Sequence, residues 1–352
     1  MSQSNSGIGN VTPNTALLEM AMAYSRSRVL LAAARLGVAD ALGDEVRTLG
    51  FLAEQCQADV NALYRLLRAL SSIGVTEETT PEHFRLTAFG KPLRRDEPHS
   101  VWPAVIFWAD LLADEWSFLT DSVRTGKPAS QLRDPKIPSR WSQDPQAGSI
   151  FRAVMGTAPA EDYAPIAKAW DFSRAKVVAD LGGGGGSLIL AILALNPHLR
   201  GMLVDLEPSV SAAKSRFAAE DPSSRCELVV ADLTQSVPAG ADVYILKHVI
   251  HGDQDEDAIP ILKNCRAVIP QNGSLLIVEF ILPPLVSHAD PQLESLLMSD
   301  LNMLAVTGGK ERSEREWKSL LEAGGFILTG VYPVGGDTLM VRNVGILEAK
   351  PA

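Results

Sequence analysis

The chain has 352 residues, of which 46% are hydrophobic and 21% are charged, as in ordinary globular proteins. It carries 32 basic and 42 acidic residues, so its formal net charge is −10 and the chain as a whole repels nucleic-acid phosphates. The 3 cysteines are too widely spaced for a metal-ligand pair or a disulfide framework. These features exclude a disordered chain and a small disulfide-rich scaffold.

Neither a membrane span nor a secretory signal is expected. No uncharged apolar run approaches the roughly 18 residues that a transmembrane helix needs. The first residues, Met-Ser-Gln-Ser-Asn-Ser, have no basic region and no apolar core. A reducing cytoplasm is therefore the expected location.

Helical periodicity begins the chain, and a short strand pair follows it. Asp59 is placed to cap the third expected helix, which Gly74 ends. Helix, turn, helix and two strands form the winged-helix pattern. The expected helices are 15–42, 49–55 and 60–73, and the expected strands are 75–76 and 84–86.

The winged-helix pattern raises the alternative of a DNA-binding transcription factor with a ligand-sensing domain. The second helix of the motif offers Arg65 and Arg68 among apolar and small residues, whereas the wing is acidic at Glu77, Glu78 and Glu82. Reading a base requires polar side chains that reach its edge, with cations around them for the phosphates. We therefore expect no nucleic-acid partner, and packing against another subunit suits this apolar module better.

From residue 176 onward, short apolar strands alternate with helices, which predicts a mainly parallel sheet covered on both faces. The predicted fold class is α/β: a Rossmann-like doubly wound domain over residues 99–352, after a helical winged-helix domain over residues 1–98. The expected strands are 176–181, 201–206, 226–230, 243–247, 275–280, 326–331 and 338–344, and the expected helices are 160–170, 187–195, 209–220, 258–268 and 314–323.

A run of glycines, Gly182 to Gly186, stands where the first of these strands gives way to a helix. Glycine costs conformational entropy, so this run indicates a backbone that approaches a ligand closely. The dinucleotide pattern G-x-G-x-x-G fits in no frame, because its last glycine falls on Ser187 or Leu188. Asp180, just before the run, suits a cationic amino group and repels a pyrophosphate. S-adenosylmethionine is favoured, with a nicotinamide oxidoreductase as the alternative.

Two more acids stand where the next two strands end. In open α/β sheets, ligands bind at the carboxyl ends of the strands. Asp205 could accept hydrogen bonds from ribose hydroxyls there, and Asp232 could reach an adenine amino group, with Leu233 against the ring. A single acid after a strand is often only a surface residue. Acids at the ends of three consecutive strands favour a ligand site more strongly, so we predict an adenosyl site.

His248 and His251 follow the fourth strand of the domain. Their spacing of three would place them on one face of a helix. A metal pair is conceivable, but no carboxylate or third histidine stands at ligand spacing along the chain. No metal is predicted.

The motifs together resemble those of class I S-adenosylmethionine-dependent O-methyltransferases of the plant caffeate and flavonoid type and of their bacterial natural-product relatives. The resemblance covers nearly the whole chain, and the motifs keep the order of that family. They are Val178 to Gly186, Val204-Asp205-Leu206, Ala231-Asp232-Leu233, Ile245 to His251, Val278-Glu279 and Gly308 to Ser313.

The family resemblance implies an assembly, a cofactor and a set of site residues. It implies a homodimer formed through the N-terminal module, and S-adenosyl-L-methionine as a cofactor that leaves as S-adenosyl-L-homocysteine. It implies cofactor contacts from Asp180, Gly182, Gly184, Asp205, Leu206, Asp232, Leu233 and Lys247. It also implies the catalytic set His251, Glu279 and Glu311 and a substrate pocket lined by Phe151, Met155 and Met303.

A base at His251 makes chemical sense for methyl transfer to a small aromatic or polyketide-like hydroxyl. A phenol with a pKa of about 10 is mostly protonated at neutral pH, and a neutral imidazole can take its proton as the methyl group arrives. Glu279 is expected to orient the ring through its other nitrogen, as in catalytic triads, and Glu311 to steady it from a loop.

This chain departs from the family pattern in two places. Gly252 and Asp253 follow the histidine where the family usually has Asp-Trp. The loop between Met303 and Gly308 also differs, so plant substrates are not carried over. Relatives with this fold that catalyse decarboxylation or hydroxylation leave those reactions as alternatives.

Overall fold

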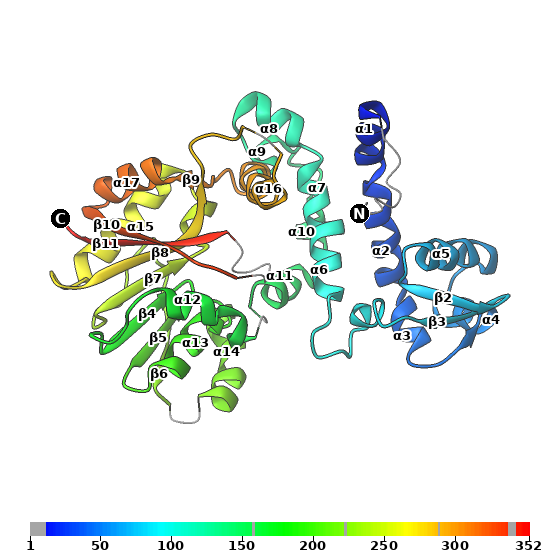
Figure 1. Cartoon of the computed structure of the whole chain (residues 1–352), viewed down its shortest axis with the longest axis horizontal. Coiled ribbons are helices and arrows are strands. Elements are labelled where there is room, and N and C mark those ends of the chain that lie inside the picture. The colour runs from blue at the N-terminus through cyan, green and yellow to red at the C-terminus, as the bar shows by residue number, and fades with distance from the viewer. Residues whose placement is uncertain (1–11, 157–158, 222–223, 288, 337–342) are drawn as a thin grey trace, which may run out of the picture. The chain divides into compact units, whose positions relative to one another are not determined.

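The computed structural model describes residues 12–156, 159–221, 224–287, 289–336 and 343–352. The chain forms two compact units, Met1–Ala113 and Asp114–Ala352 (Figure 1). The domain boundary predicted after residue 98 falls inside the first unit, and as a functional boundary it stays a prediction. Within the described residues, no helix is long and apolar enough to cross a bilayer.

The first unit has the predicted winged-helix order, with a three-stranded sheet of order β1-β3-β2. The single helix predicted over residues 15–42 is wrong: the chain forms three helices there, because Gly37 takes the left-handed φ of 68° and ends the second. The elements are α1 Pro13–Met22, α2 Tyr24–Leu36, α3 Val38–Leu42, β1 Arg47–Thr48, α4 Leu49–Gln55, α5 Val60–Ser72, β2 Thr76–Thr80, β3 His83–Leu86, η1 Lys91–Leu93, α6 Trp102–Ile106 and the π-helix η2 Phe107–Leu111.

Helix α5 confirms its predicted cap. The Ala62 N–H donates to Asp59 Oδ1 at 2.9 Å, which satisfies one of the free amides of the first turn. The basic groups beside the wing are paired with its acids, since Arg68 lies 3.6 Å from Glu78 and Arg85 lies 2.7 Å from Glu77.

The second unit is built on an open sheet of order β10-β11-β8-β7-β4-β5-β6. Helix α7, Leu112–Trp116, lies where the two units divide. The other elements are α8 Leu119–Thr125, α9 Ala129–Leu132, α10 Arg140–Gln143, α11 Ala147–Gly156, η3 Ala160–Tyr163, α12 Ala164–Ala169, β4 Val177–Leu181, α13 Ser187–Leu195, β5 Arg200–Asp205, α14 Glu207–Glu220, β6 Cys226–Val230, β7 Val243–Lys247, η4 Ile250–Gly252, α15 Asp255–Val268, β8 Ser274–Leu282, α16 Pro291–Val306, β9 Arg312–Ser313, α17 Glu314–Ala323, β10 Phe326–Pro333 and β11 Val344–Pro351.

The predicted parallel sheet is confirmed for strands β4 to β8, and β11 runs antiparallel to β8 and β10. The strand predicted at 338–344 lies mostly outside the described residues, and the described strand β11 begins at Val344. Strand order reverses between β4 and β7, so the loops after these strands diverge there. Such a reversal is where doubly wound sheets form their ligand crevice.

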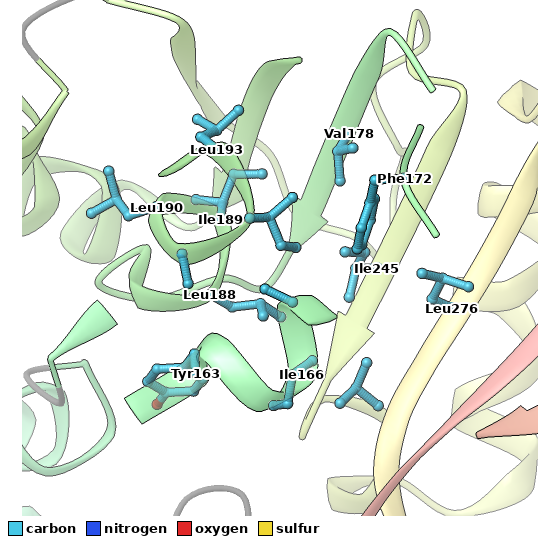
Figure 2. Close-up of a cluster of buried hydrophobic side chains, with 14 of the residues drawn as sticks. Tyr163, Ile166, Phe172, Val178, Leu188, Ile189, Leu190, Leu193, Ile245 and Leu276 are labelled. Carbon is cyan, nitrogen blue, oxygen red and sulfur yellow. The ribbon is translucent and has the colours of Figure 1, made fainter. Parts of the chain in front are cut away.

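Two apolar cores cover the two faces of this sheet. One packs α12, α13 and α14 onto the sheet through side chains such as Ile166, Ile189 and Phe217. Figure 2 shows part of this core, including Ile166 and Ile189. The other packs α15 and α17 through Leu262 and Trp317. Because the central strands are buried on both sides, they are continuous apolar runs in the sequence.

The sequence patterns did not predict the helices α6 to α11 or α16. Several of these helices have only 4 or 5 residues, too few to show a helical period. Helix α16 has 16 residues, but its apolar positions are spread around the helix and mixed with polar ones such as Ser299, Asp300 and Asn302. These polar positions prove important at the site described next.

Candidate active site

The loop between β4 and α13 is built from left-handed backbone. Gly182, Gly184 and Gly186 have φ values of 68°, 57° and 78°, a region in which residues with side chains are strained. A Cβ added to Gly184 would meet nothing within 4 Å. Gly184 is therefore required for its conformation, and the space beside it leaves room for a ligand.

Asp205, the last residue of β5, fixes this loop. Its Oδ2 accepts a hydrogen bond from Gly184 N at 2.8 Å, and its Oδ1 accepts one from Leu206 N at 2.7 Å. Each oxygen has a further lone pair, so the carboxylate can still accept hydrogen bonds from a sugar.

Asp180 lies inside β4, against the loop, and only 1% of it is exposed. Its Oδ2 has no hydrogen-bond partner among the described residues. Burial raises the pKa of Asp180 to about 7, although the Lys247 charge opposes the shift. A buried carboxylate oxygen without a partner, next to an open glycine loop, fits a cationic amino group and does not fit a phosphate.

The other predicted cofactor residues surround the same strand ends. Lys247 ends β7 with its Nζ 5.0 Å from the Tyr163 ring, and burial lowers its pKa to about 8. Asp232 is exposed after β6, and Thr234 donates to it through its backbone N and Oγ1. Leu233 is buried beside it, whereas Leu206 is 55% exposed.

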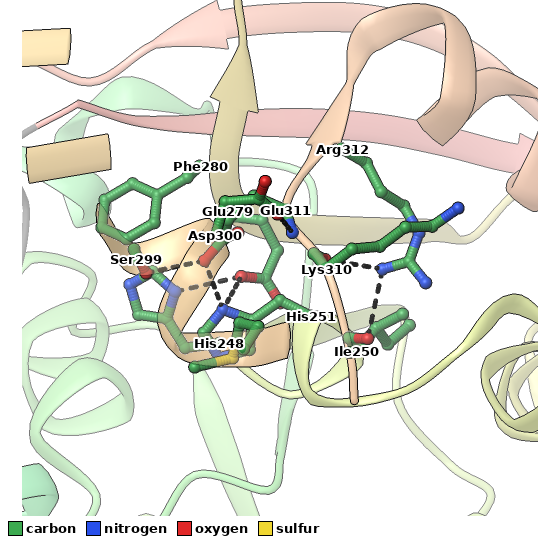
Figure 3. Close-up of polar contacts among 12 residues, drawn as sticks. His248, Ile250, His251, Glu279, Phe280, Ser299, Asp300, Lys310, Glu311 and Arg312 are labelled. Carbon is green, nitrogen blue, oxygen red and sulfur yellow. Dashed lines mark hydrogen bonds and ion pairs between the residues drawn. The ribbon is translucent and has the colours of Figure 1, made fainter. Parts of the chain in front are cut away.

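Two histidines and two glutamates meet across the neighbouring strand ends (Figure 3). His251 Nδ1 lies 3.0 Å from Glu311 Oε1 and 3.6 Å from Glu279 Oε2. Glu279 Oε2 is closer to His248 Nδ1, at 3.0 Å, and its Oε1 accepts a hydrogen bond from Val249 N at 3.1 Å. Glu311 therefore forms the short contact with His251 that we expected of Glu279.

Helix α16 supports Glu311 with two side chains that the sequence did not reveal. Ser299 Oγ donates to Glu311 Oε1 at 2.9 Å, and Asp300 Oδ1 accepts from Glu311 N at the same distance. Met303, predicted in the substrate pocket, lies one turn after Ser299 and so shares its helix face.

Burial and the neighbouring charges shift the pKa values of the two rings in opposite directions. Burial lowers the pKa of His251, but Glu279 and Glu311 outweigh it and raise the pKa to about 9. Burial together with the Lys247 charge lowers the pKa of His248 to about 4. At neutral pH the free enzyme therefore holds a charged His251 beside a neutral His248.

The same cluster corrects our argument about metal ligands. A carboxylate does meet the two histidines, because His248, His251 and Glu279 bring one ligand atom each within 4.8 Å of one another. Nor do the rings share a helical face: His248 has a φ of 51°, and His251 follows in the 3₁₀ turn η4. Because both imidazoles already pair with carboxylates, we interpret the cluster as a hydrogen-bond network.

The segment that carries Glu311 packs against the turn that carries His251 and forms hydrogen bonds with it. A Cβ on Gly309 would collide with the His251 carbonyl oxygen, so only glycine allows this approach. Arg312 is fully buried and donates to the carbonyls of Ile250 and Asp253 at 3.2 and 2.9 Å. It also pairs with Asp255 at 2.8 Å.

The predicted pocket residues Phe151 and Met155 lie four apart on one face of α11, with 41% and 39% exposed. The Phe151 ring packs edge-on against Trp141. Gly252 and Asp253, which depart from the family pattern, line a cavity of about 340 Å³ with Gly308 and neighbouring residues. The departure thus leaves open space beside the His251 turn.

The fold and the site together define a class I methyltransferase that uses S-adenosylmethionine. The features that do so are the reversal of strand order in the open sheet, the left-handed glycine loop and the acids at the strand ends. Residues 116–327 match the O-methyltransferase domain model, and residues 18–95 match the O-methyltransferase dimerisation domain. The chain belongs to this O-methyltransferase family. The predicted family, fold class and cofactor are confirmed.

Similar proteins include both O- and N-methyltransferases. The chain is 34% identical to phenazine O-methyltransferase PhzM of Lysobacter antibioticus over 99% of both chains. It is 35% identical to O-demethylpuromycin-O-methyltransferase of Streptomyces alboniger over 95% of this chain and 88% of that one. It is also 33% identical to 8-amino-8-demethylriboflavin N,N-dimethyltransferase of Streptomyces davaonensis over 87% and 88% of the two chains.

A solved structure with bound ligands is also similar. NcsB1, an O-methyltransferase from neocarzinostatin biosynthesis in complex with S-adenosylmethionine and 2-hydroxy-5-methyl naphthoic acid, aligns with a TM-score of 0.76 at 29% identity. The alignment covers 98% of this chain and 100% of that one.

Proposed function

We propose that this enzyme methylates a phenolic hydroxyl of a small aromatic or polyketide-like natural product, with His251 as the general base. The observation that carries the proposal is the buried contact of His251 Nδ1 with Glu311 at 3.0 Å. This contact occupies one ring nitrogen and leaves Nε2 to meet the acceptor oxygen. A base held in this way by a carboxylate is typical of proton-transfer sites.

The reaction needs the acceptor to lose one proton. S-adenosylmethionine supplies a methyl group made electrophilic by the positive sulfur. When His251 is neutral, its Nε2 would take the hydroxyl proton while the acceptor oxygen bonds to the methyl carbon and the methyl–sulfur bond breaks, which releases S-adenosylhomocysteine. A charged His251 beside a bound phenolate has the same number of protons as a neutral His251 beside a phenol. The His251 pKa of about 9 is therefore compatible with methylation that starts from a bound phenolate beside a charged His251 and with methylation that starts from a phenol beside a neutral His251.

The proposed cofactor contacts are those of the strand ends. Asp180 would receive the cationic group, Asp205 the ribose hydroxyls and Asp232 the adenine amino group, with Gly182 and Gly184 giving close approach. This assignment is supported by the glycine loop and by the Asp180 oxygen, which has no hydrogen-bond partner in the part of the chain that the structure describes. A homodimer formed through the N-terminal module, and a cytoplasmic location, complete the proposal.

The test pairs hydroxyl and amino acceptors on the same ring. We would incubate the enzyme with S-adenosylmethionine and with hydroxynaphthoates, hydroxyphenazines and their amino counterparts, and identify products by mass spectrometry. We expect O-methyl products in step with S-adenosylhomocysteine. Methylation of the amino series alone would assign the chain to the N-methylating relatives. Decarboxylated or hydroxylated products would show one of the other reactions.

A further inference from the structure

His248 lies beside the proposed base, yet the proposed reaction gives it no proton to carry. Its backbone is left-handed, with a φ of 51°, which is uncommon for a residue with a side chain. Its ring stacks on His251 with centroids 5.2 Å apart and contacts Phe280 with centroids 5.0 Å apart. Packing against these two rings restrains where the nitrogens of the His248 ring point.

The neutral His248 ring donates to Glu279. Nδ1 lies 3.0 Å from Glu279 Oε2, and an ionised carboxylate only accepts hydrogen bonds, so the ring hydrogen belongs on Nδ1. Glu279 is fully buried, and the imidazoles hold its pKa below the usual range against the effect of burial. His248 thus satisfies a buried charge without adding a charge of its own.

The oxygen that His248 engages is also the one that faces the base. Glu279 Oε2 lies 3.6 Å from His251 Nδ1, too far for a good hydrogen bond, while the other oxygen accepts from Val249 N. His251 makes its own short contact with Glu311. Glu279 therefore acts on His251 by charge, and its hydrogen bond goes to His248.

We propose that His248 is a positioning residue that holds Glu279 away from His251 and so limits how tightly the base keeps its proton. Without this donor, Glu279 Oε2 can close the 3.6 Å gap and share the His251 Nδ1–H with Glu311 in a three-centre, charge-assisted hydrogen bond. The proposal rests on the proposed role of His251 as base.

The charged groups around His251 are attached to elements other than the His248 side chain, so a substitution of His248 removes none of them. They come from separate elements: Glu279 on β8, Glu311 before β9, Asp300 on α16, Lys247 at the end of β7 and Asp253 after η4. Among the described residues, Glu279 is the group that loses a hydrogen bond to the His248 ring. A change in the titration of His251 can therefore be traced to Glu279.

Three substitutions separate the donor from the shape of the ring. H248N keeps an N–H donor near the position of Nδ1, and asparagine tolerates the left-handed backbone. H248G removes the donor without backbone strain. H248F removes the donor but keeps an aromatic ring between His251 and Phe280. Thermal unfolding and S-adenosylhomocysteine affinity would confirm that each variant folds.

The measurement is a nitrogen NMR titration of ¹⁵N-histidine-labelled enzyme saturated with S-adenosylhomocysteine, with the His251 signals assigned by their loss in H251A. We expect H248G and H248F to raise the His251 midpoint by roughly half to one pH unit, and H248N to leave it near wild type. The acid limb of kcat/KM should move in the same direction.

An unchanged midpoint in both H248G and H248F would overturn the proposal. So would an equal shift in H248N, because the ring and not its donor would then matter. The titration needs no turnover. Failure of the wild-type enzyme to methylate any acceptor would refute the proposed function, whereas the NMR midpoints test His248 separately.

Discussion

The glycine loop and the histidine–carboxylate cluster adjoin the same end of the sheet but are assembled differently. The loop is local: Asp180 and Gly182 to Gly186 are consecutive or nearly so, and Asp205 comes from the adjacent strand. The cluster joins His251 to Glu311, which is 60 positions away along the chain. The proposed cofactor site thus depends on local backbone, whereas the proposed base depends on tertiary packing. Substitutions should therefore affect cofactor affinity and turnover separately.

The largest separation is expected from H251A. Removing a general base costs about 10²- to 10⁴-fold in kcat, while S-adenosylhomocysteine affinity should stay at the wild-type value. Steady-state kinetics and calorimetry check both quantities. H83A, an exposed histidine of the wing, is the matched control. Wild-type kcat in H251A would show that another group takes the proton.

The converse variant is D180N. Loss of a buried charge-assisted contact should weaken S-adenosylhomocysteine binding by roughly 10- to 100-fold. Because the pKa of Asp180 is about 7, wild-type affinity should fall as the pH drops below 7, when the carboxylate gains a proton. Calorimetry at several pH values checks this.

The control for D180N is D242N, since Asp242 accepts from Lys176 N and Val177 N at the opposite end of β4. The affinity of D242N should match wild type. A D180N enzyme with full affinity and an unchanged pH dependence would contradict the assignment of Asp180 to the cofactor.

The support of the cluster is tested by R312M. Methionine keeps much of the side-chain volume but leaves the Ile250 and Asp253 carbonyls without the Arg312 donor, while Asp255 keeps only its contact with Lys310. We expect the free energy of unfolding to fall by about 2 kcal/mol, less than for a fully buried ion pair because Asp255 is 45% exposed. Chemical denaturation measures this. An unchanged stability would mean that water replaces the guanidinium.

The smallest effect is a shift in pH dependence in E311Q. Glu311 helps to raise the pKa of His251 to about 9, so removing its charge should lower the acid limb of kcat/KM by about one pH unit. A lower pKa leaves more His251 in the neutral form at neutral pH. The kcat/KM of E311Q at that pH should therefore fall less than the loss of the Glu311 hydrogen bond alone would predict. A limb that stays near pH 9 would assign that ionisation to the acceptor.

The contrast between the regions also explains what the sequence could predict. Apolar runs predict the central strands, and consecutive glycines predict the glycine loop. The bounds predicted for β6, β7, α13 and α17 agree with those in the structure. Asp59 at the start of α5 is a similar local signal. These features depend on neighbours in the chain.

The cluster could be predicted only in part. The family motifs pointed to His251, Glu279 and Glu311, but not to which glutamate contacts which histidine. That pairing depends on the left-handed His248 and on the packing of α16, which supplies Ser299. A serine in a helix with mixed polarity carries no signal along the chain. Its role appears only when the fold brings it to Glu311.

The Asp205 carboxylate, which accepts from both Gly184 and Leu206, has a consequence for the catalytic cycle. In the proposed cofactor site, folding has already ordered this loop, so binding of the nucleoside would not include the entropic cost of ordering it. In each catalytic cycle, S-adenosylhomocysteine would then leave and S-adenosylmethionine would bind without a rearrangement of the loop.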